Sequence, residues 1–221
     1  MSKISVVICD DQPLIVSSLK LILETDGRIE VVGTANNGAA GVEMVQTLNP
    51  TLALMDIQMP QMDGIEATTK IIGHTDTKVI VLTTFNRDDY LFDAMDAGAS
   101  GFLLKNSEPE MLINAVHQVA AGNGLLSPEV TLKLIKGRAH KAIDAAEQSS
   151  NPESGRLKEL TERELQVLGE LAKGKNNQEI ATSLSLSEAT VKTHLSNLLA
   201  KLHLRDRVQG VLFAHRAGLI Q

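Results

Sequence analysis

The sequence predicts two folded parts, a doubly wound α/β domain on a parallel sheet followed by a small all-α domain. Three observations lead to this prediction. Over residues 1–122, five short apolar runs alternate with five stretches of helical periodicity. Over residues 157–221, every periodic stretch is helical. Residues 1–125 carry 16 acids and seven bases, whereas residues 126–221 carry 11 acids and 14 bases, so the two parts are expected to meet different partners.

The first part begins with an apolar, β-branched run and then alternates strand and helix. Strands are expected at 4–9, 29–34, 52–55, 79–84 and 101–104. Helices are expected at 13–23, 37–48, 64–72, 88–97 and 109–121. Right-handed crossovers limit the strand orders that are open to this sheet. The flavodoxin-like order 2-1-3-4-5 places the ends of the first and third strands at the switch point, where ligands bind.

An acid follows the apolar run at 52–55, and it is the first candidate functional residue. Asp56 ends the expected third strand, and Pro60 and Gly64 then turn the chain. A buried carboxylate is costly unless it is paired or bound to a metal. The alternative interpretation is an ordinary helix-cap or turn acid. The other expected strand ends add the polar residues Asp10, Asp11, Thr83, Thr84 and Lys105.

These side chains together suit phosphoryl transfer. Clustered carboxylates repel each other, so one carboxyl pKa would rise unless a cation is present, and hard oxygen ligands with open positions suit Mg²⁺. Asp56 is then a carboxylate nucleophile toward a phosphoryl group. Mg²⁺ and Lys105 would neutralise charge on the transferring group, and Thr83 would donate its hydroxyl to a phosphoryl oxygen.

Four motifs carry a resemblance to a known family. They are the Asp10-Asp11 pair, Met-Asp-Ile-Gln-Met-Pro-Gln-Met-Asp-Gly around Asp56, Leu-Thr-Thr at 82–84 and Gly-Phe-Leu-Leu-Lys at 101–105. With these motifs, residues 1–122 resemble the receiver domain of two-component response regulators. The resemblance implies that Asp56 is the phospho-acceptor for a partner sensor histidine kinase.

The same resemblance implies a metal site and a switch. Thr83 would move toward the phosphoryl group, and the ring of Phe102 would follow it inward; Lys105 would bind the phosphoryl group. The implied Mg²⁺ site consists of Asp11, Asp56 and the carbonyl of Gln58 as ligands, with Asp10 acting through water.

The sequence departs from the receiver pattern at three positions. Phe102 stands where the family often has Tyr, so a hydroxyl contact is lost, and Gln12 stands where this subclass commonly has His. Asn106 follows Lys105 where many receivers have Pro, often after a cis peptide. A non-proline cis bond would cost about 3 kcal/mol, so the geometry of this peptide stays open.

Residues 123–156 are predicted to connect the two parts. Ser127 to Lys136 suits one short helix, with Ser127 as its cap and Pro128 at its first position. Residues 137–156 lose periodicity and become polar and rich in turn formers. We therefore expect a connecting helix and a flexible linker.

The last part, residues 157–221, predicts four helices. Thr161 and Glu164 have the spacing of a capping box. A short helix at 177–184, a turn at 185–187 and a longer helix at 188–202 have the pattern of a helix-turn-helix. The outward face of the longer helix carries donors suited to base edges or phosphates, while the alternative is a four-helix bundle with a solvated polar face. These donors are Lys192, Thr193, Ser196 and Asn197.

A second resemblance favours the DNA-binding interpretation. Leu-Thr-Glu-Arg-Glu-Leu-Gln-Val-Leu, Asn-Gln-Glu-Ile-Ala and Ser-Glu-Ala-Thr-Val-Lys-Thr-His-Leu-Ser-Asn-Leu-Leu-Ala-Lys-Leu resemble the LuxR-type helix-turn-helix over residues 158–221. The resemblance implies base contacts from Lys192, Thr193 and Ser196. It implies phosphate contacts from Asn176, Thr190 and Lys201, and a dimer face formed by Val208, Val211 and Leu212 on the fourth helix. The alternative is that the fourth helix packs only on its own domain.

Together the two parts resemble a response regulator of the NarL/FixJ type. Such a protein is a phosphorylation-controlled transcription factor that dimerises and binds paired half-sites on double-stranded DNA, with RNA polymerase as a further candidate partner. A phospho-independent DNA-binding regulator that uses its receiver only for dimerisation is the runner-up. An enzyme of the haloacid-dehalogenase type is disfavoured, because Gln58 stands where that chemistry needs a second Asp. We therefore expect no turnover of an external substrate.

Composition excludes several other classes. Cys9 is the one cysteine, so an intramolecular disulfide is excluded, as is typical of a cytoplasmic protein. The first apolar run meets Asp10 and Asp11 too early for a secretory signal. The uncharged stretch 111–128 is too polar to span a membrane. The absence of Trp argues against base-stacking nucleic-acid modules but not against a helix in the major groove.

Overall fold

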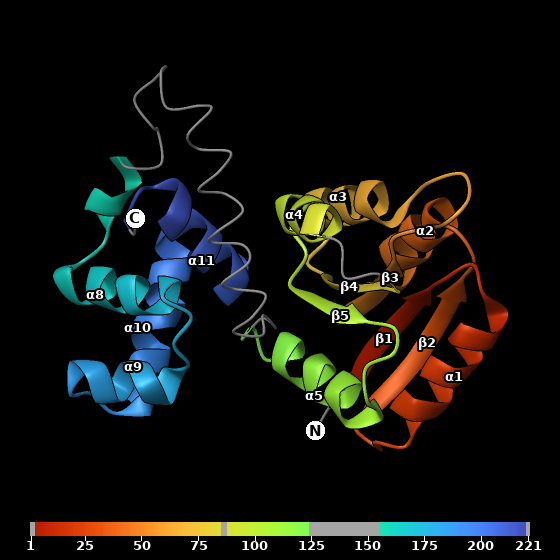
Figure 1. Ribbon diagram of the computed structural model, residues 1–221, viewed down its shortest axis with the longest axis horizontal. Helices are drawn as coiled ribbons and strands as arrows, with labels where there is room; N and C mark the ends of the chain where they lie inside the picture. The colour runs from red at the N-terminus through yellow and green to blue at the C-terminus, as the bar shows by residue number, and fades with distance from the viewer. Residues whose placement is uncertain (1–2, 85–87, 124–154, 220–221) are drawn as a thin grey trace. The chain divides into compact units, whose positions relative to one another are not determined.

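The computed structural model describes residues 3–84, 88–123 and 155–219 (Figure 1). The chain divides into two compact units, residues 1–125 and 126–221. The connecting helix expected at Ser127–Lys136, and most of the linker expected at 137–156, lie outside the described residues. Each unit is described by itself below.

The first unit is a five-stranded parallel sheet in the order β2-β1-β3-β4-β5, which confirms the predicted order. Its strands are β1 (Ile4–Cys9), β2 (Ile29–Ala35), β3 (Leu52–Asp56), β4 (Lys78–Thr83) and β5 (Gly101–Leu104). Its helices are α1 (Pro13–Glu24), α2 (Gly38–Leu48), α3 (Gly64–His74), α4 (Asp88–Asp96) and α5 (Pro109–Ala120).

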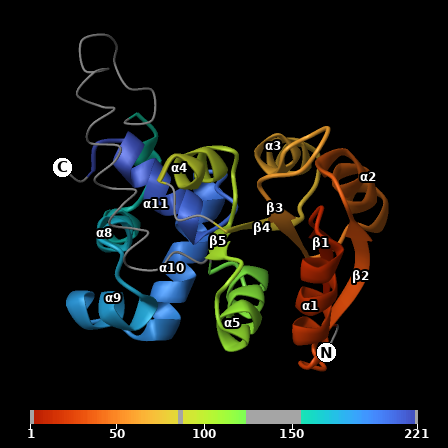
Figure 2. The same cartoon turned by 45° about the vertical axis from the view of Figure 1, so that its right-hand side comes forward.

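Helices cover both faces of this sheet. Helices α1 and α5 lie on one face, and α2, α3 and α4 lie on the other (Figures 1 and 2). The core under α1 and α5 joins Leu23 and Val116 to the central strands. Every residue of β3 is buried, because a central parallel strand is covered by helices on both sides. This double burial is why the strand appears in the sequence as a continuous apolar run.

The strand register brings the carboxyl ends of the central strands to one edge. Cys9 of β1 pairs with Met55 of β3, and Thr83 of β4 pairs with Leu104 of β5. The residues that follow these pairs therefore meet at the same rim. Thr84 lies one residue beyond the end of β4 and is exposed.

The second unit is helical throughout its described residues. It contains the 3₁₀ turn η1 (Leu157–Glu159) and the helices α8 (Glu162–Ala172), α9 (Asn177–Leu184), α10 (Glu188–Lys201) and α11 (Arg207–Arg216). The views show α9 lying against α10 (Figures 1 and 2). Ser185 takes a left-handed conformation (φ 54°) and Ser187 caps α10. A short helix, a tight turn and a longer helix thus form the predicted helix-turn-helix.

The second unit begins before residue 157. Gly155 and Arg156, which the sequence assigned to the linker, are helical. Arg156 lies over the ring of Phe213, 5.4 Å from its centroid, and donates a hydrogen bond to the carbonyl of Leu202. These contacts attach the end of the expected linker to the helical unit. Among the described residues, no helix combines the length and the apolar character that a membrane span requires.

Candidate functional site

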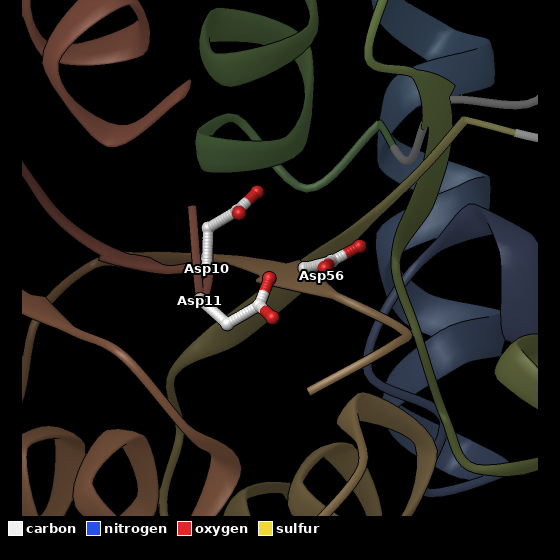
Figure 3. Close-up of side chains that lie close together, drawn as sticks. All are labelled: Asp10, Asp11 and Asp56. Carbon is white, nitrogen blue, oxygen red and sulfur yellow. The ribbon is translucent and has the colours of Figure 1, made fainter. Parts of the chain in front are cut away.

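Three carboxylates meet at the rim of the sheet (Figure 3). Asp10 and Asp11 follow β1, and Asp56 is the last residue of the neighbouring strand β3. One carboxylate oxygen from each residue lies within 4.8 Å of the other two. Asp10 and Asp56 are only 1% and 3% exposed, whereas Asp11 is exposed to solvent. The site is therefore a largely buried pair of acids with a third acid at its opening.

Lys105 joins this cluster from the end of β5. Its Nζ lies 2.7 Å from Asp10 Oδ2 and 3.0 Å from Asp56 Oδ2, and its side chain is 5% exposed. The backbone N–H of Lys105 donates to the carbonyl of Thr83 at 2.8 Å. The Lys105–Asn106 peptide is trans, since the described residues contain no cis peptide bond. One ammonium thus serves two buried carboxylates that belong to different strands.

Burial and the Lys105 charge shift the pKa of Asp56 in opposite directions. Burial raises the pKa of the Asp56 carboxyl, the Lys105 ammonium opposes this, and the charge of Asp10 adds to the rise, so that the pKa lies above its usual value. Burial lowers the pKa of Lys105, but its two carboxylate partners outweigh burial and the pKa is raised. The lysine therefore stays charged, and the cluster holds more negative charge than one ammonium neutralises.

The donor set fits a hard divalent cation. Mg²⁺ takes oxygen ligands at about 2.0–2.1 Å in an octahedron, so its opposite ligands lie roughly 4.2 Å apart. Oxygens within 4.8 Å of one another need only small side-chain movements to reach that geometry. Asp10 Oδ1 is already used by the backbone N–H of Gln12, at 3.0 Å. Asp56 accepts from Lys105 and from the backbone N–H of Ile57, so the ligand roles of Asp11 and Asp56 stay predictions.

Gln58 is exposed beside this cluster, and its side-chain amide donates to Tyr90 Oη at 3.4 Å. Its role as a carbonyl ligand stays a prediction. Thr83, at the end of β4, is 3% exposed, and Phe102 in β5 is 8% exposed. Both residues of the predicted switch pair are thus buried on neighbouring strands, and their movement stays a prediction.

Gly64 has a role that the sequence did not suggest beyond a turn. A Cβ at this position would lie 1.9 Å from the backbone oxygen of Asp56. The Gly64 N–H donates to the Ile57 carbonyl at 2.9 Å, and Asp63 caps α3 by accepting from the Glu66 N–H at 2.8 Å. Only glycine permits this close approach of α3 to the strand end that carries Asp56.

The helix-turn-helix presents the predicted polar face. Lys192, Thr193 and Ser196 are all exposed on α10. Lys192 forms an ion pair with Glu188 one turn earlier, at 3.0 Å, and the Thr193 hydroxyl donates to the Ala189 carbonyl at 3.0 Å. These side chains are accessible to a ligand, and their base contacts stay predictions.

The three predicted phosphate contacts have different surroundings. Asn176 is exposed and caps α9, and Thr190 is half-buried in a hydrogen bond with Ser187 at 2.7 Å. Lys201 lies 2.7 Å from Glu164, whose side chain is only 4% exposed. Burial raises the pKa of Glu164, but Lys201 and Thr161 outweigh it, so the pKa is lowered. Lys201 therefore has a structural ion pair that the sequence did not reveal.

The predicted dimer residues are all buried in the chain. Val211 belongs to the hydrophobic core of the second unit, together with Leu168 and Leu198. Val208 and Leu212 are 1% exposed, although neither is part of that core cluster as far as the described residues define it. Val211 thus fits the alternative of packing on its own domain, and the dimer face stays a prediction.

An α/β unit with an acid–lysine cluster, joined to a helix-turn-helix unit, defines the class of two-domain regulators that act on nucleic acid. Residues 6–117 match the response regulator receiver domain, and residues 158–214 match the LuxR family of bacterial regulatory proteins. The chain belongs to the response regulators that carry a LuxR-type DNA-binding domain.

Two known regulatory proteins resemble this chain over nearly its whole length, and a solved receiver structure resembles its first part. The chain is 37% identical over 218 residues to the transcriptional regulatory protein LnrK of Bacillus subtilis, covering 98% of each chain. It is 38% identical to the transcriptional regulatory protein LiaR of the same organism, covering 98% of this chain and 99% of LiaR. The receiver domain of the putative response regulator NarL from Mycobacterium tuberculosis superposes with a TM-score of 0.55 at 33% identity, covering 56% of this chain and all of that structure.

Proposed function

We propose that Asp56 accepts a phosphoryl group from a partner sensor histidine kinase, and that this modification controls DNA binding by the second unit. The observation that carries the proposal is the position of Asp56, which has a carboxylate oxygen within 4.8 Å of oxygens of Asp10 and Asp11 and lies 3.0 Å from the Lys105 ammonium. A charged cluster of this kind suits phosphoryl transfer, which depends mainly on positioning and charge neutralisation.

Each residue of the cluster has a distinct role in the proposed transfer. An Asp56 oxygen attacks phosphorus, the bond from phosphorus to the kinase imidazole nitrogen breaks, and an acyl phosphate forms. Lys105 binds the transferred oxygens, and the Thr83 hydroxyl donates to one of them. Asp11 and Asp56 would hold Mg²⁺, with Asp10 acting through water. A bound Mg²⁺ would supply charge neutralisation, which also keeps Asp56 ionised despite its raised pKa.

Phosphorylation would then favour a dimer that reads paired half-sites. Two half-sites one helical turn apart match a protein two-fold axis. On this proposal α10 reads bases through Lys192 and Thr193, and Asn176 at the start of α9 contacts the DNA backbone. RNA polymerase is the further partner expected of a transcription regulator. Release of phosphate from external phosphoesters is not part of the proposal.

The test is the mass of the full-length protein after treatment with acetyl phosphate and Mg²⁺. The wild type should gain one phosphoryl group, and Asp56→Asn should gain none. Asp63→Asn is the matched control, because Asn caps a helix as well as Asp does, and it should be phosphorylated like the wild type. A phosphorylated Asp56→Asn protein would show that another residue is the acceptor.

A second measurement separates the proposal from the phospho-independent alternative. Fluorescence anisotropy with a labelled operator duplex should show tighter binding after phosphorylation of the wild type. Asp56→Asn should bind equally with and without acetyl phosphate. Equal affinity of the phosphorylated and unphosphorylated wild type would favour a receiver that serves only dimerisation.

A further inference from the structure

Arg207, the first residue of α11, reaches across the second unit to the start of α9. One guanidinium nitrogen donates to Asn177 Oδ1 at 2.9 Å, and another donates to the backbone carbonyl of Lys175. Asn177 begins α9, and Lys175 lies in the loop before it. A single side chain therefore ties α11 to the connection between α8 and α9.

The location of Arg207 is unfavourable for a cation in two respects. A positive charge at a helix N-terminus opposes the helix dipole, so the charge of Arg207 does not favour the start of α11. The described residues also provide it with no carboxylate at ion-pair distance, and both acceptors are neutral. Burial lowers the pKa of Arg207 to about 10, with Glu179 acting weakly in the other direction. The two hydrogen bonds to the start of α9 are what offsets these costs, and proteins break local rules most often at functional sites.

The two acceptors of Arg207 flank Asn176. Asn176 forms a capping box with Glu179: its Oδ1 accepts from the Glu179 N–H at 2.9 Å, and its own N–H donates to Glu179 Oε2 at 2.7 Å. The capping box fixes Asn176 from within α9, and Arg207 fixes the residues on either side of it from α11. The backbone at this exposed helix start is consequently held from two independent directions.

We propose that Arg207 is a positioning residue for DNA binding, which holds Asn176 and the start of α9 in place against a phosphodiester of the DNA backbone. The proposal rests on the proposed DNA-binding function and adds a residue that does not itself touch the ligand. An open depression lies at the same place; Lys173 and Lys175, which both pair with Glu170, line it together with Asn176 and Glu179. A rigid contact loses less entropy on binding than a mobile one.

Arg207→Lys in the full-length protein tests this, because it keeps the charge while an ammonium cannot span both acceptors. Binding to a fluorescein-labelled random-sequence duplex is measured over a range of salt concentrations. Because Asn176 is neutral, its phosphate contact releases no counterion, so losing it should weaken binding about fivefold at every salt concentration and leave the logarithmic salt slope unchanged. Arg163→Lys, at an exposed arginine of α8 that donates only to Gln166 among the described residues, should leave the affinity unchanged.

Asn177→Ala provides an independent variant that keeps Arg207 and removes one acceptor. It should weaken binding in the same way, and combining it with Arg207→Lys should give less than the sum of the two effects. An unchanged affinity for both variants, with circular dichroism showing folded protein, would overturn the proposal. In that case a Lys192→Ala protein that still binds more weakly than the wild type would leave the DNA-binding function intact. A wild type that fails to bind the duplex at low salt would overturn both.

Discussion

Lys105 is the most informative residue to remove, because two buried carboxylates share it. Its Nζ lies 2.7 Å from Asp10 and 3.0 Å from Asp56, whose side chains are 0% and 5% exposed. Removing one partner of a buried ion pair typically costs about 3–5 kcal/mol. The lower end applies here, because the exposed Asp11 marks an opening through which water reaches the acids. Lys105→Met should therefore lower the free energy of unfolding of the first unit by about 3 kcal/mol at pH 7 without a divalent cation.

Mg²⁺ should reverse part of this loss. A divalent cation among the carboxylates takes over the neutralising role, and in the variant it no longer meets the repulsion of the ammonium. If half of the loss is recovered, Mg²⁺ binds the variant about tenfold more tightly than the wild type, since about 1.4 kcal/mol corresponds to a factor of ten. The stabilisation by a Mg²⁺ concentration that saturates both proteins should be larger in the variant by the same amount.

Differential scanning calorimetry of the full-length protein, in EDTA and in Mg²⁺, measures both effects. For a unit of this size, about 3 kcal/mol corresponds to a fall in Tm of roughly 10 °C. Lys70→Met is the matched control, because Lys70 pairs with Glu66 at 2.8 Å while both side chains are about half exposed. It should change stability by less than about 0.5 kcal/mol. Equal melting of Lys105→Met and wild type in EDTA, or equal stabilisation of both by Mg²⁺, would refute the reasoning.

Three other changes test neighbouring features. The pKa of Asp56 is raised on folding, so the first unit without Mg²⁺ should lose stability as pH rises through the folded pKa. The affinity for Mg²⁺ should fall as pH drops below that pKa, because Asp56 is then protonated. Calorimetric titration with Mg²⁺ at several pH values measures this, and an affinity that does not change with pH would contradict it. Gly64→Ala should destabilise the first unit by at least about 2 kcal/mol and reduce phosphorylation, because its Cβ meets the Asp56 carbonyl oxygen. Gly73→Ala, with nothing within 4 Å, is the control and should be neutral or stabilising in thermal unfolding. Glu164→Gln should destabilise the second unit by about 1 kcal/mol at pH 7. The expected loss is small because Lys201, the partner of Glu164, is 39% exposed and solvent screens the pair. The Glu164 pKa is lowered on folding, so its contribution is present above its unfolded pKa, and the difference in Tm should vanish as pH falls through the folded pKa.

The sequence predicted the order of elements because buried parallel strands leave a strong signal. β3 is buried at all five positions, and this appears as a run without polar interruption. Strand ends are less predictable. Thr84 suits a strand by its β-branched side chain, but β4 ends at Thr83, where its partner strand β5 ends at Leu104. Pairing with the neighbouring strand, which no local pattern records, determined that boundary.

The residues of the candidate site were predictable from the sequence, but the pairing of their side chains was not. Asp10, Asp56 and Lys105 were predicted because each follows an apolar run, and parallel strands bring their ends together. Lys105 pairs with both buried acids because of side-chain packing, which the sequence does not show. The pairing of Glu164 with Lys201 and the contacts of Arg207 join positions about 30 or more residues apart, with no short-range pattern to mark them.

The charge of the site indicates where a phosphoryl group would act. Phosphorylation replaces the single charge of Asp56 by a group of about −1.5 to −2, next to an acid pair that already shares one ammonium. Lys105 must then divide its hydrogen bonds between Asp10 and the new oxygens, and any movement of Lys105 acts directly on Thr83, whose carbonyl its backbone N–H holds at 2.8 Å. We therefore expect phosphorylation of Asp56 to affect strands β4 and β5 of the sheet. Phe102 lies in β5 and pairs with Val81 of β4, and its predicted part in the switch stays a prediction.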